Sequence, residues 1–228
     1  MTRNTLKALL LTTLATASVG AFATESADMA IRGTIRPPAC NVDLSGAGRL
    51  DLGTISANTL SKTEGTQIAE SPMTMTISCE APTIFGITTI DNRAGTLGQT
   101  ANAAANGAPG QFMGLGAVNG TSVGAYYARL ITAGTTGDGN SITNIYSADG
   151  GVSYRPSGVN GPHAEGAFVM PGERLHAYSI TGETTPSAFS TVVQPMLIGV
   201  YANSIDTLPP LTDGVPLDGS LTFQIQYF

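Results

Sequence analysis

The last eight residues of the sequence are LTFQIQYF, and from Leu221 to Tyr227 they alternate between apolar and polar side chains. The apolar positions are Leu221, Phe223, Ile225 and Tyr227. A period of two residues predicts a β-strand with one buried face, because successive side chains of a strand point to opposite sides. Four apolar side chains on one face need another layer to pack against, so this segment commits the chain to a sheet with a core.

The same kind of signal recurs along the chain, and no segment has a convincing amphipathic helical period. Further strands are expected in the ranges 29–35, 73–79, 83–90, 112–118, 122–131, 141–146, 167–170, 175–180 and 191–201. Pro195 predicts an edge strand or a bulge in the last of these ranges, since proline cannot donate to a ladder. The range 42–52 carries a Gly-rich turn at 45–48 and reaches the short run 50–55. Many short strands separated by turn residues predict an all-β protein built as a β-sandwich.

Two stretches are expected to form long loops, at about 94–110 and 132–165. The first is rich in Gly, Ala, Asn and Gln, and we expect no core to be built from it. Between these stretches, Asn119-Gly120 predicts a tight hairpin.

The first 23 residues have the pattern of a secretory signal peptide. Arg3 and Lys7 precede an apolar run, and Ala21-Phe-Ala23 is a small-residue cleavage site. No stretch is long and apolar enough to predict a transmembrane helix. Removing residues 1–23 lowers Lys+Arg from 10 to 8 against 16 Asp+Glu, which gives a net charge of about −8. A chain this acidic is not expected to bind nucleic acid.

Cys40 and Cys79 are the only cysteines. In the oxidising compartment that a signal peptide implies, a pair without competitors predicts one disulfide, and two free buried thiols are the alternative. Closing a loop of about 40 residues would stabilise the fold by roughly 4 kcal/mol.

The residues that usually carry catalysis are scarce, and we expect no enzyme, no metal and no cofactor. The two histidines, His163 and His176, have no metal-ligand spacing and are interpreted as ordinary loop or surface residues. Asp138-Gly-Asn140 offers two short oxygen ligands for calcium, but a solvated turn is favoured. The segment 147–154 resembles an Asp-box of sialidase propellers, and because it occurs once it is read as a β-turn.

Several features together resemble a subunit of a chaperone-usher fimbria. They are the signal peptide, Gly33-Thr-Ile35 leading to Cys40, the run Leu50-Asp-Leu-Gly53, the alternating strand that ends at Cys79, and the final strand with penultimate Tyr227. The middle of the chain, including Asp91-Asn-Arg-Ala-Gly95 and Phe112-Met-Gly-Leu-Gly116, resembles the pilin-like proteins associated with β-fimbria clusters.

The resemblance implies an immunoglobulin-like sandwich that lacks its last strand and is completed by donor-strand complementation. Its partners would be a periplasmic fimbrial chaperone, an outer-membrane usher and neighbouring subunits. The strand facing the chaperone and the donor would carry Leu221, Phe223, Ile225, Tyr227 and Phe228, and the disulfide would join Cys40 and Cys79. The candidate donor residues are Met29, Ile31, Gly33 and Ile35.

The resemblance also sets domain bounds: a signal peptide at 1–23, an extension with the start of the first strand at 24–35, and the sandwich at 36–228. Because the family pattern puts residues 31–36 inside the first strand, either the donor overlaps Met29, Ile31 and Gly33, or this subunit donates poorly. The expected function is a structural subunit of a surface fimbria, exported through the periplasm, that contributes to adhesion and meets a host or surface receptor. The alternative is a self-contained secreted or periplasmic adhesin-like protein with ligand loops in 94–160.

Overall fold

The structure, a computed structural model, describes residues 26–36, 38–106, 108, 110–158 and 165–228. The proposed signal peptide therefore lies outside the described residues, as does His163. The chain divides into two units, one ending at Ile35 and one formed by Arg36–Phe228. Residues 26–35 have no assigned secondary structure, and every one of them is exposed.

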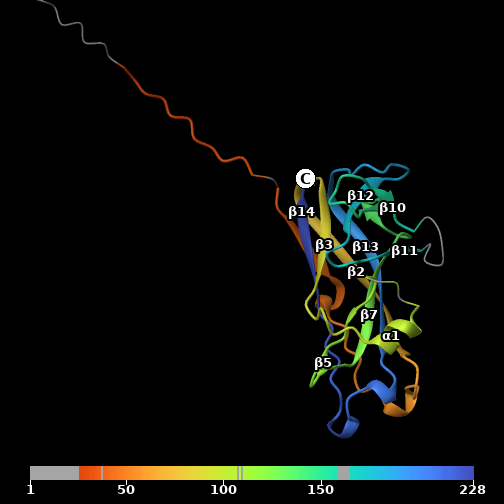
Figure 1. Ribbon diagram of the computed structural model, residues 1–228. Helices are drawn as coiled ribbons and strands as arrows, with labels where there is room; N and C mark the ends of the chain where they lie inside the picture. Colours follow the sequence, from red (N-terminus) through yellow and green to blue (C-terminus); the bar gives the residue numbers. More distant parts are fainter. Residues whose placement is uncertain (1–25, 37, 107, 109, 159–164) are drawn as a thin grey trace, which may run out of the picture. The chain divides into compact units, whose positions relative to one another are not determined.

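The second unit is all-β, with strands and short helices connected by tight turns (Figure 1). The strands are β1 Cys40–Leu44, β2 Thr66–Thr83, β3 Phe85–Asp91, β4 Met113–Gly114, β5 Ala117–Val118, β6 Thr121–Ser122, β7 Gly124–Ile131, β8 Thr136–Gly137, β9 Asn140–Ser147, β10 Arg155–Pro156, β11 Gly166–Phe168, β12 Leu175–Ile180, β13 Phe189–Ala202 and β14 Leu221–Tyr227. The helices are α1 Gln99–Ala104 and the 3₁₀ turns η1 Ser45–Gly48, η2 Ala57–Thr59, η3 Ile205–Thr207 and η4 Leu211–Asp213.

The named strands pair only in antiparallel fashion and form two packed layers. One layer contains β1, β2, β13 and β7, with β4, β8 and β11 beside them. The other contains β10, β9, β12, β3 and β14 in that order. Since β8 pairs with both β13 and β9, one hydrogen-bonded path runs from β1 through both layers to β14. The sandwich is thus a nearly closed belt whose two ends are β1 and β14.

The core lies between the two layers and is formed by the side chains on one face of each strand. Its most deeply buried side chains include Met75, Ile77, Ile87, Tyr178, Val192 and Met196, each at most 1% exposed. Alternate positions of β2 and β13 point outward and are more exposed, as the period of two predicts. The expected all-β sandwich is confirmed.

Two strands in this sandwich match the sequence pattern closely. β14 spans Leu221–Tyr227 and β12 spans Leu175–Ile180, as expected. The hairpin at Asn119-Gly120 is also confirmed, with φ of 50° and 81° at the two turn residues, and it joins β5 to β6. The expectation that Pro195 marks an edge strand or a bulge is wrong, because β13 is paired on both sides and has no register shift at this residue. On the side away from β2, Pro195 lies where the partner of β13 changes from β8 to β7. The missing N–H therefore interrupts no ladder on that side.

The prediction that 94–110 contributes nothing to the core is wrong. Part of this stretch forms α1, and Ala101 is fully buried in a second apolar cluster with Phe112, Tyr127 and Phe168. The glycine at position 65 lets the helix approach closely, because a Cβ on Gly65 would lie 2.6 Å from the Cα of Ala101. The interval 132–165 is likewise no continuous loop, because β8, β9 and β10 run through it.

The expected strand at 29–35, and with it a first strand containing residues 31–36, is also wrong. The first strand begins at Cys40, beyond the Pro-containing stretch 36–38. Alternation gives a segment the capacity to pair, but a strand needs a partner edge. Among the described residues no strand pairs with 26–35.

Candidate functional site

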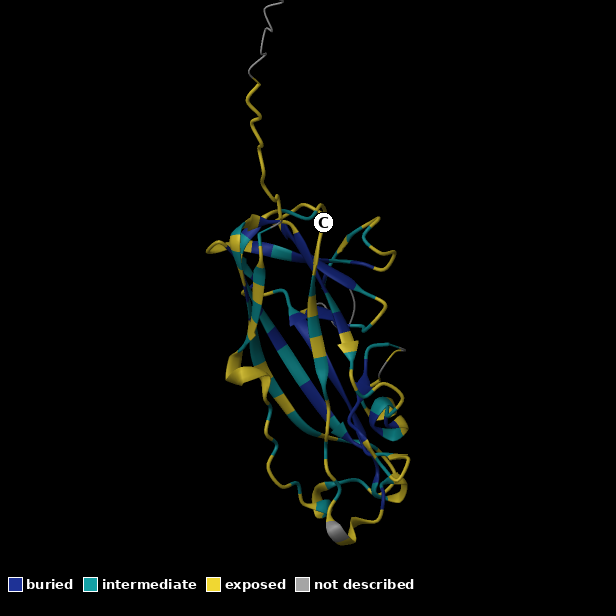
Figure 2. Ribbon diagram, turned by 90° about the vertical axis from the view of Figure 1, so that its left-hand side faces the viewer, coloured by how far each residue is buried: buried dark blue, intermediate teal, exposed yellow. Residues whose placement is uncertain are grey.

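The two ends of the belt expose strand edges. β14 pairs with β3 only, and β1 pairs with β2 only, among the strands that the structure describes. Figure 2 shows exposed and half-buried residues alternating along β14 up to the C label. Unpaired edges of this kind are templates for pairing with another chain.

The register of β14 shows which backbone groups face its free edge. At one end, the N–H of Asn92 donates to the carbonyl of Ser220 at 3.0 Å, and at the other the N–H of Phe228 donates to that of Ile84 at 3.5 Å. In an antiparallel ladder, hydrogen-bonded pairs recur at every second residue. The even-numbered residues of β14 therefore bond to β3, and the N–H groups of Phe223, Ile225 and Tyr227 point to the free edge.

The edge of β1 has the same organisation. The N–H of Glu80 donates to the carbonyl of Ala39 at 3.0 Å, so residues 39, 41 and 43 form the bonded pairs with β2. The N–H groups of Cys40, Val42 and Leu44 consequently point away from β2. Two sets of outward backbone donors and acceptors thus border the gap between β1 and β14.

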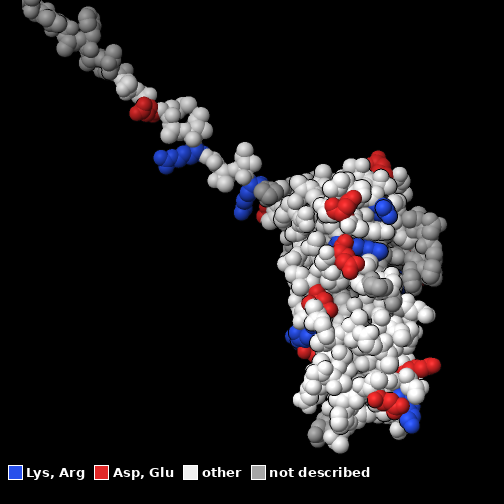
Figure 3. All heavy atoms as spheres, in the orientation of Figure 1, with Lys and Arg blue, Asp and Glu red and all other residues white. Residues whose placement is uncertain are grey.

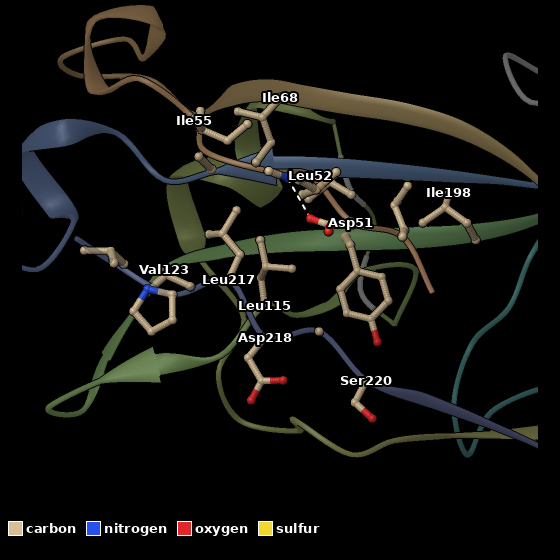
Figure 4. Close-up of a pocket in the computed structure, with 18 of the residues that line it drawn as sticks. Asp51, Leu52, Ile55, Ile68, Leu115, Val123, Ile198, Leu217, Asp218 and Ser220 are labelled. Atoms are coloured by element: carbon tan, nitrogen blue, oxygen red, sulfur yellow. Dashed lines mark hydrogen bonds between the residues drawn. The ribbon is translucent and has the colours of Figure 1, made fainter. Parts of the chain in front are cut away.

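An apolar groove of about 790 Å³ lies between these two edges (Figure 4). Its aliphatic and aromatic lining includes Leu44, Leu50, Leu52, Ile55, Ile68, Leu115, Tyr126, Ile198, Val200, Leu217, Leu221 and Phe223. In Figure 4 the side chains of Ile55, Ile68 and Leu52 lie on one side of the groove, with those of Leu217 and Leu115 opposite. Burial raises the pKa of the Tyr126 phenol, with a smaller contribution from Asp91, so this lining hydroxyl stays neutral.

The groove leaves apolar side chains incompletely covered. Leu221, Phe223 and Ile225 project toward the inner face of the sandwich but are only half-buried, and Tyr227 is 38% exposed. The cross-strand neighbour of Ile225 on β3, Ile87, is fully buried. A further strand laid along the groove would bury the apolar side chains of β14 and also pair the free edge.

The loop between η1 and η2 contributes one wall of the groove. Leu50, Leu52 and Ile55 come from this stretch, which follows the Gly-rich turn expected at 45–48 and has no assigned strand. Asp51 points out of this wall and accepts the N–H of Gly53 at 2.8 Å, which shapes the loop. Sequence reasoning noted the run 50–53 but gave it no role; its alternation of leucine with polar residues was the available signal.

One end of the groove is closed. The disulfide Cys40–Cys79 is present as predicted and covalently joins paired residues of β1 and β2. At this end the N–H of Cys40 donates to the hydroxyl of Tyr227 at 2.8 Å, so β1 and β14 touch. The groove lining includes Leu44 and Phe223 but neither Cys40 nor Tyr227.

The candidate donor segment, described by itself, is extended and apolar on alternate positions. Met29, Ile31 and Ile35 are 83%, 85% and 103% exposed. Gly33 continues the alternation, and a Cβ placed on it would meet nothing within 4 Å. Three large apolar side chains this exposed form an apolar face that a binding surface on another polypeptide could cover.

His176 is not a loop or surface residue, which corrects the sequence interpretation. It lies inside β12, paired with Ile87 on one side and Tyr146 on the other, and is 1% exposed. Burial, and secondarily the positive charge of Arg174, lowers its pKa from 6.5 to about 3. The imidazole is therefore neutral in the folded protein at ordinary pH.

The two acidic turns are structural. Asp138 has φ of 49° in the β8–β9 turn, and its carboxylate accepts the N–H groups of Ser190 and Thr191. Asp149 accepts the N–H groups of Val152 and Ser153, which makes 147–154 the β-turn expected from its sequence. Hydrogen bonds from Ser147 and Ser153 lower the pKa of the Asp149 carboxyl. The Asp138 carboxylate thus ties its turn to the start of β13, and the Asp149 carboxylate is used within its own turn.

Charged groups are sparse. Figure 3 shows acidic and basic side chains scattered over one face without forming a continuous patch. The described residues include no group of three or more His, Cys, Asp or Glu side chains placed to hold a metal ion. None of the helices in the described ranges is long and apolar enough to cross a membrane.

Comparison with known proteins places this fold in a family. The model of the family described as "Protein of unknown function (DUF1120)" matches residues 29–146, which is more than half of the chain. The chain belongs to the DUF1120 family. The match begins at Met29 in the exposed segment and ends in β9, so it includes β1 and the loop wall of the groove but not β14.

Two Escherichia coli (strain K12) proteins resemble this DUF1120 chain over nearly its full length. Protein GltF is 27% identical over 251 aligned residues, covering 99% of this chain and 98% of GltF. The uncharacterized protein YhcF is 26% identical over 236 aligned residues, covering 92% of this chain and 94% of YhcF. Both alignments extend well beyond the part matched by the DUF1120 family model.

Proposed function

We propose that this DUF1120 chain is a non-enzymatic structural subunit of a bacterial surface fimbria, and that it assembles by accepting a strand from another polypeptide. The observation that carries the proposal is the open belt. Two unpaired strand edges, β1 and β14, border an apolar groove whose lining is only half-buried. The resemblance of the sequence to chaperone-usher subunits supports the same assembly route.

Strand addition would pair the free backbone groups of β14 and would cover the half-buried apolar lining of the groove. Backbone groups of the entering strand would pair with the outward N–H and carbonyl groups of β14, which supplies affinity. Its alternate apolar side chains would fill the groove, which supplies register. Each large side chain moved from water into the groove contributes on the order of 1.5–3 kcal/mol.

The entering strand we propose between subunits is the segment 26–35 of a neighbouring copy or a related subunit. Met29, Ile31 and Ile35 offer the apolar face, and with the first strand beginning only at Cys40 the segment is not committed to its own sheet. The donor segment therefore does not overlap the first strand, although the family pattern implied that it would. Before assembly, a periplasmic chaperone would cover the groove, and an outer-membrane usher would receive the subunit for export to the cell surface and a role in adhesion.

The experiment adds synthetic peptides of residues 26–36 to the chain purified from a periplasm that lacks fimbrial chaperones. We expect the natural peptide to stabilise the folded chain by about 2.7 kcal/mol at one hundred times its Kd, and so to raise its melting temperature. Hydrogen exchange should slow at the amides of Phe223 and Ile225, which face the free edge, with little change at Thr222 and Gln224, which already bond to β3.

Two peptide variants make the test specific. Ile31→Asp places a charge on the apolar face and should abolish binding, whereas Ala30→Asp places the same charge on the opposite face and should bind normally. Equal loss with both variants, or no change in melting temperature with the natural peptide, would contradict strand addition. A rise in melting temperature without protection of Phe223 and Ile225 would indicate a ligand that fills the groove without pairing.

The alternative, a self-contained adhesin-like protein with ligand loops in 94–160, receives less support. Much of the described part of this interval folds onto the sandwich, with α1 packed on β7 and with β9 inside the second layer. If it were correct, the chain would be a stable monomer that is indifferent to every peptide in the experiment above.

A further inference from the structure

The last two residues of the sequence lie on opposite faces of the sheet that contains β14. Tyr227 points to the inner side, where its hydroxyl accepts the N–H of Cys40. Phe228 points to the outer side, where its ring contacts Tyr154 edge-on, with ring centres 6.3 Å apart and planes at 83°. The end of an edge strand usually frays, yet here both faces of it are engaged.

The outer contact is a shallow seat for the aromatic ring of Phe228, which remains 55% exposed. A Cβ placed on Gly86 of β3 would lie 2.9 Å from Cζ of Phe228, and one on Gly151 would lie 3.9 Å from Cε1. At Gly86 a side chain would occupy the space that the ring fills. Gly151 has φ of 97°, a backbone conformation that residues other than glycine rarely adopt.

The wall of this seat is a turn held by its own polar groups. Besides the bonds to Val152 and Ser153, the Asp149 carboxylate accepts the Ser153 hydroxyl. The Ser147 hydroxyl in turn accepts the N–H of Gly151 at 2.8 Å. These bonds fix the backbone of 147–153 and with it the positions of Gly151 and Tyr154, although the turn has no part in the groove.

We propose that the turn 147–154 is a docking site for the end of β14. By holding Phe228 on the outer face, it keeps Tyr227 against Cys40 on the inner face, and the two contacts together close the groove at its disulfide end. Tyr154 and Gly151 are then positioning residues for the groove, acting through Phe228. The consequence for an entering strand rests on the proposed function, but the docking itself does not.

The test measures amide hydrogen exchange of the free, full chain, without any peptide. Phe228→Ala and Tyr154→Ala should each speed exchange of the Gln226 amide by about tenfold after correction for intrinsic rates, and leave Thr222 unchanged. The double variant should be no faster than Phe228→Ala, because that change already removes the ring that Tyr154 contacts.

Two control variants separate local docking from general loss of stability. Val152→Ala alters the same turn at a side chain that is 85% exposed, and it should leave Gln226 unchanged. Asn92→Ala removes bonds to the side chains of Ser220 and Thr222 at the opposite end of β14, and it should speed Thr222 but not Gln226.

The outcomes that overturn the docking proposal are specific to it. Unchanged exchange at Gln226 in Phe228→Ala, or fully additive effects in the double variant, would show that Phe228 and Tyr154 do not act together. Neither result bears on whether the peptides bind, so peptide binding remains an independent test of strand addition. Conversely, failure of every peptide to bind, with the expected exchange pattern intact, would sink the proposed function and keep the docking site.

Discussion

Replacing Cys40 and Cys79 together by serine is expected to lower the free energy of unfolding by about 4 kcal/mol. The disulfide closes a long loop, since the two residues are 39 positions apart, and its loss enlarges the unfolded ensemble. It also joins β1 covalently to β2, and β1 has a paired strand on one edge only among the described strands. Urea titration of the double variant and the oxidised wild type measures the difference.

Ser78→Ala is the matched control, because Ser78 is an exposed residue of β2 next to the disulfide, paired with Asn41. It should change stability by less than about 0.5 kcal/mol. A double serine variant that loses less than about 1 kcal/mol would mean that β1 is held mainly by its ladder and its packing.

Acidification from pH 7 to pH 4 is expected to cost the protein roughly 3 kcal/mol through His176 alone. The pKa of His176 is lowered to about 3 in the folded state, against 6.5 for an unperturbed histidine. Between about pH 6.5 and pH 3 the unfolded chain therefore binds a proton at His176 that the folded chain does not bind. The stabilising contribution is complete above pH 6.5 and is lost progressively as the pH falls from 6.5 toward 3.

The measurement compares stability against pH for the wild type and His176→Leu. The variant removes the titrating group, so its curve should be flatter than that of the wild type between pH 6.5 and 4, whatever its stability at pH 7. His163→Gln serves as the control for the other histidine and should keep the slope of the wild type. Parallel curves for wild type and His176→Leu would show that His176 does not remain neutral in the folded state.

The sequence was most informative where local pattern and local structure coincide. The run at 175–180 and the alternation at 221–227 predicted both strands, because β12 is buried inside a continuous sheet and β14 alternates between half-buried and exposed positions. The pair of cysteines gave the disulfide because it had no competitor.

The failures involve contacts that are remote in sequence. The helix α1 depends on Gly65, Ala101 and the aromatic residues of β7 and β11, so its small, polar sequence reads as a loop until the sheet is present. His176 looks like a surface residue by type and is buried by its neighbours Ile87 and Tyr146. The proximity of β1 to β14 is a property of the whole belt, which no local pattern contains.

The free edge of β14 has a consequence for how the protein can be handled. Its seven residues, LTFQIQY, carry no charge and no proline, and they favour extended structure. Uncharged segments with these properties are the ones that nucleate cross-β aggregates when they are accessible. The rate of association between molecules rises with concentration, whereas the rate of folding does not. The longer the edge of β14 stays uncovered, the lower is the concentration at which the chain stays free of aggregates without a binding partner.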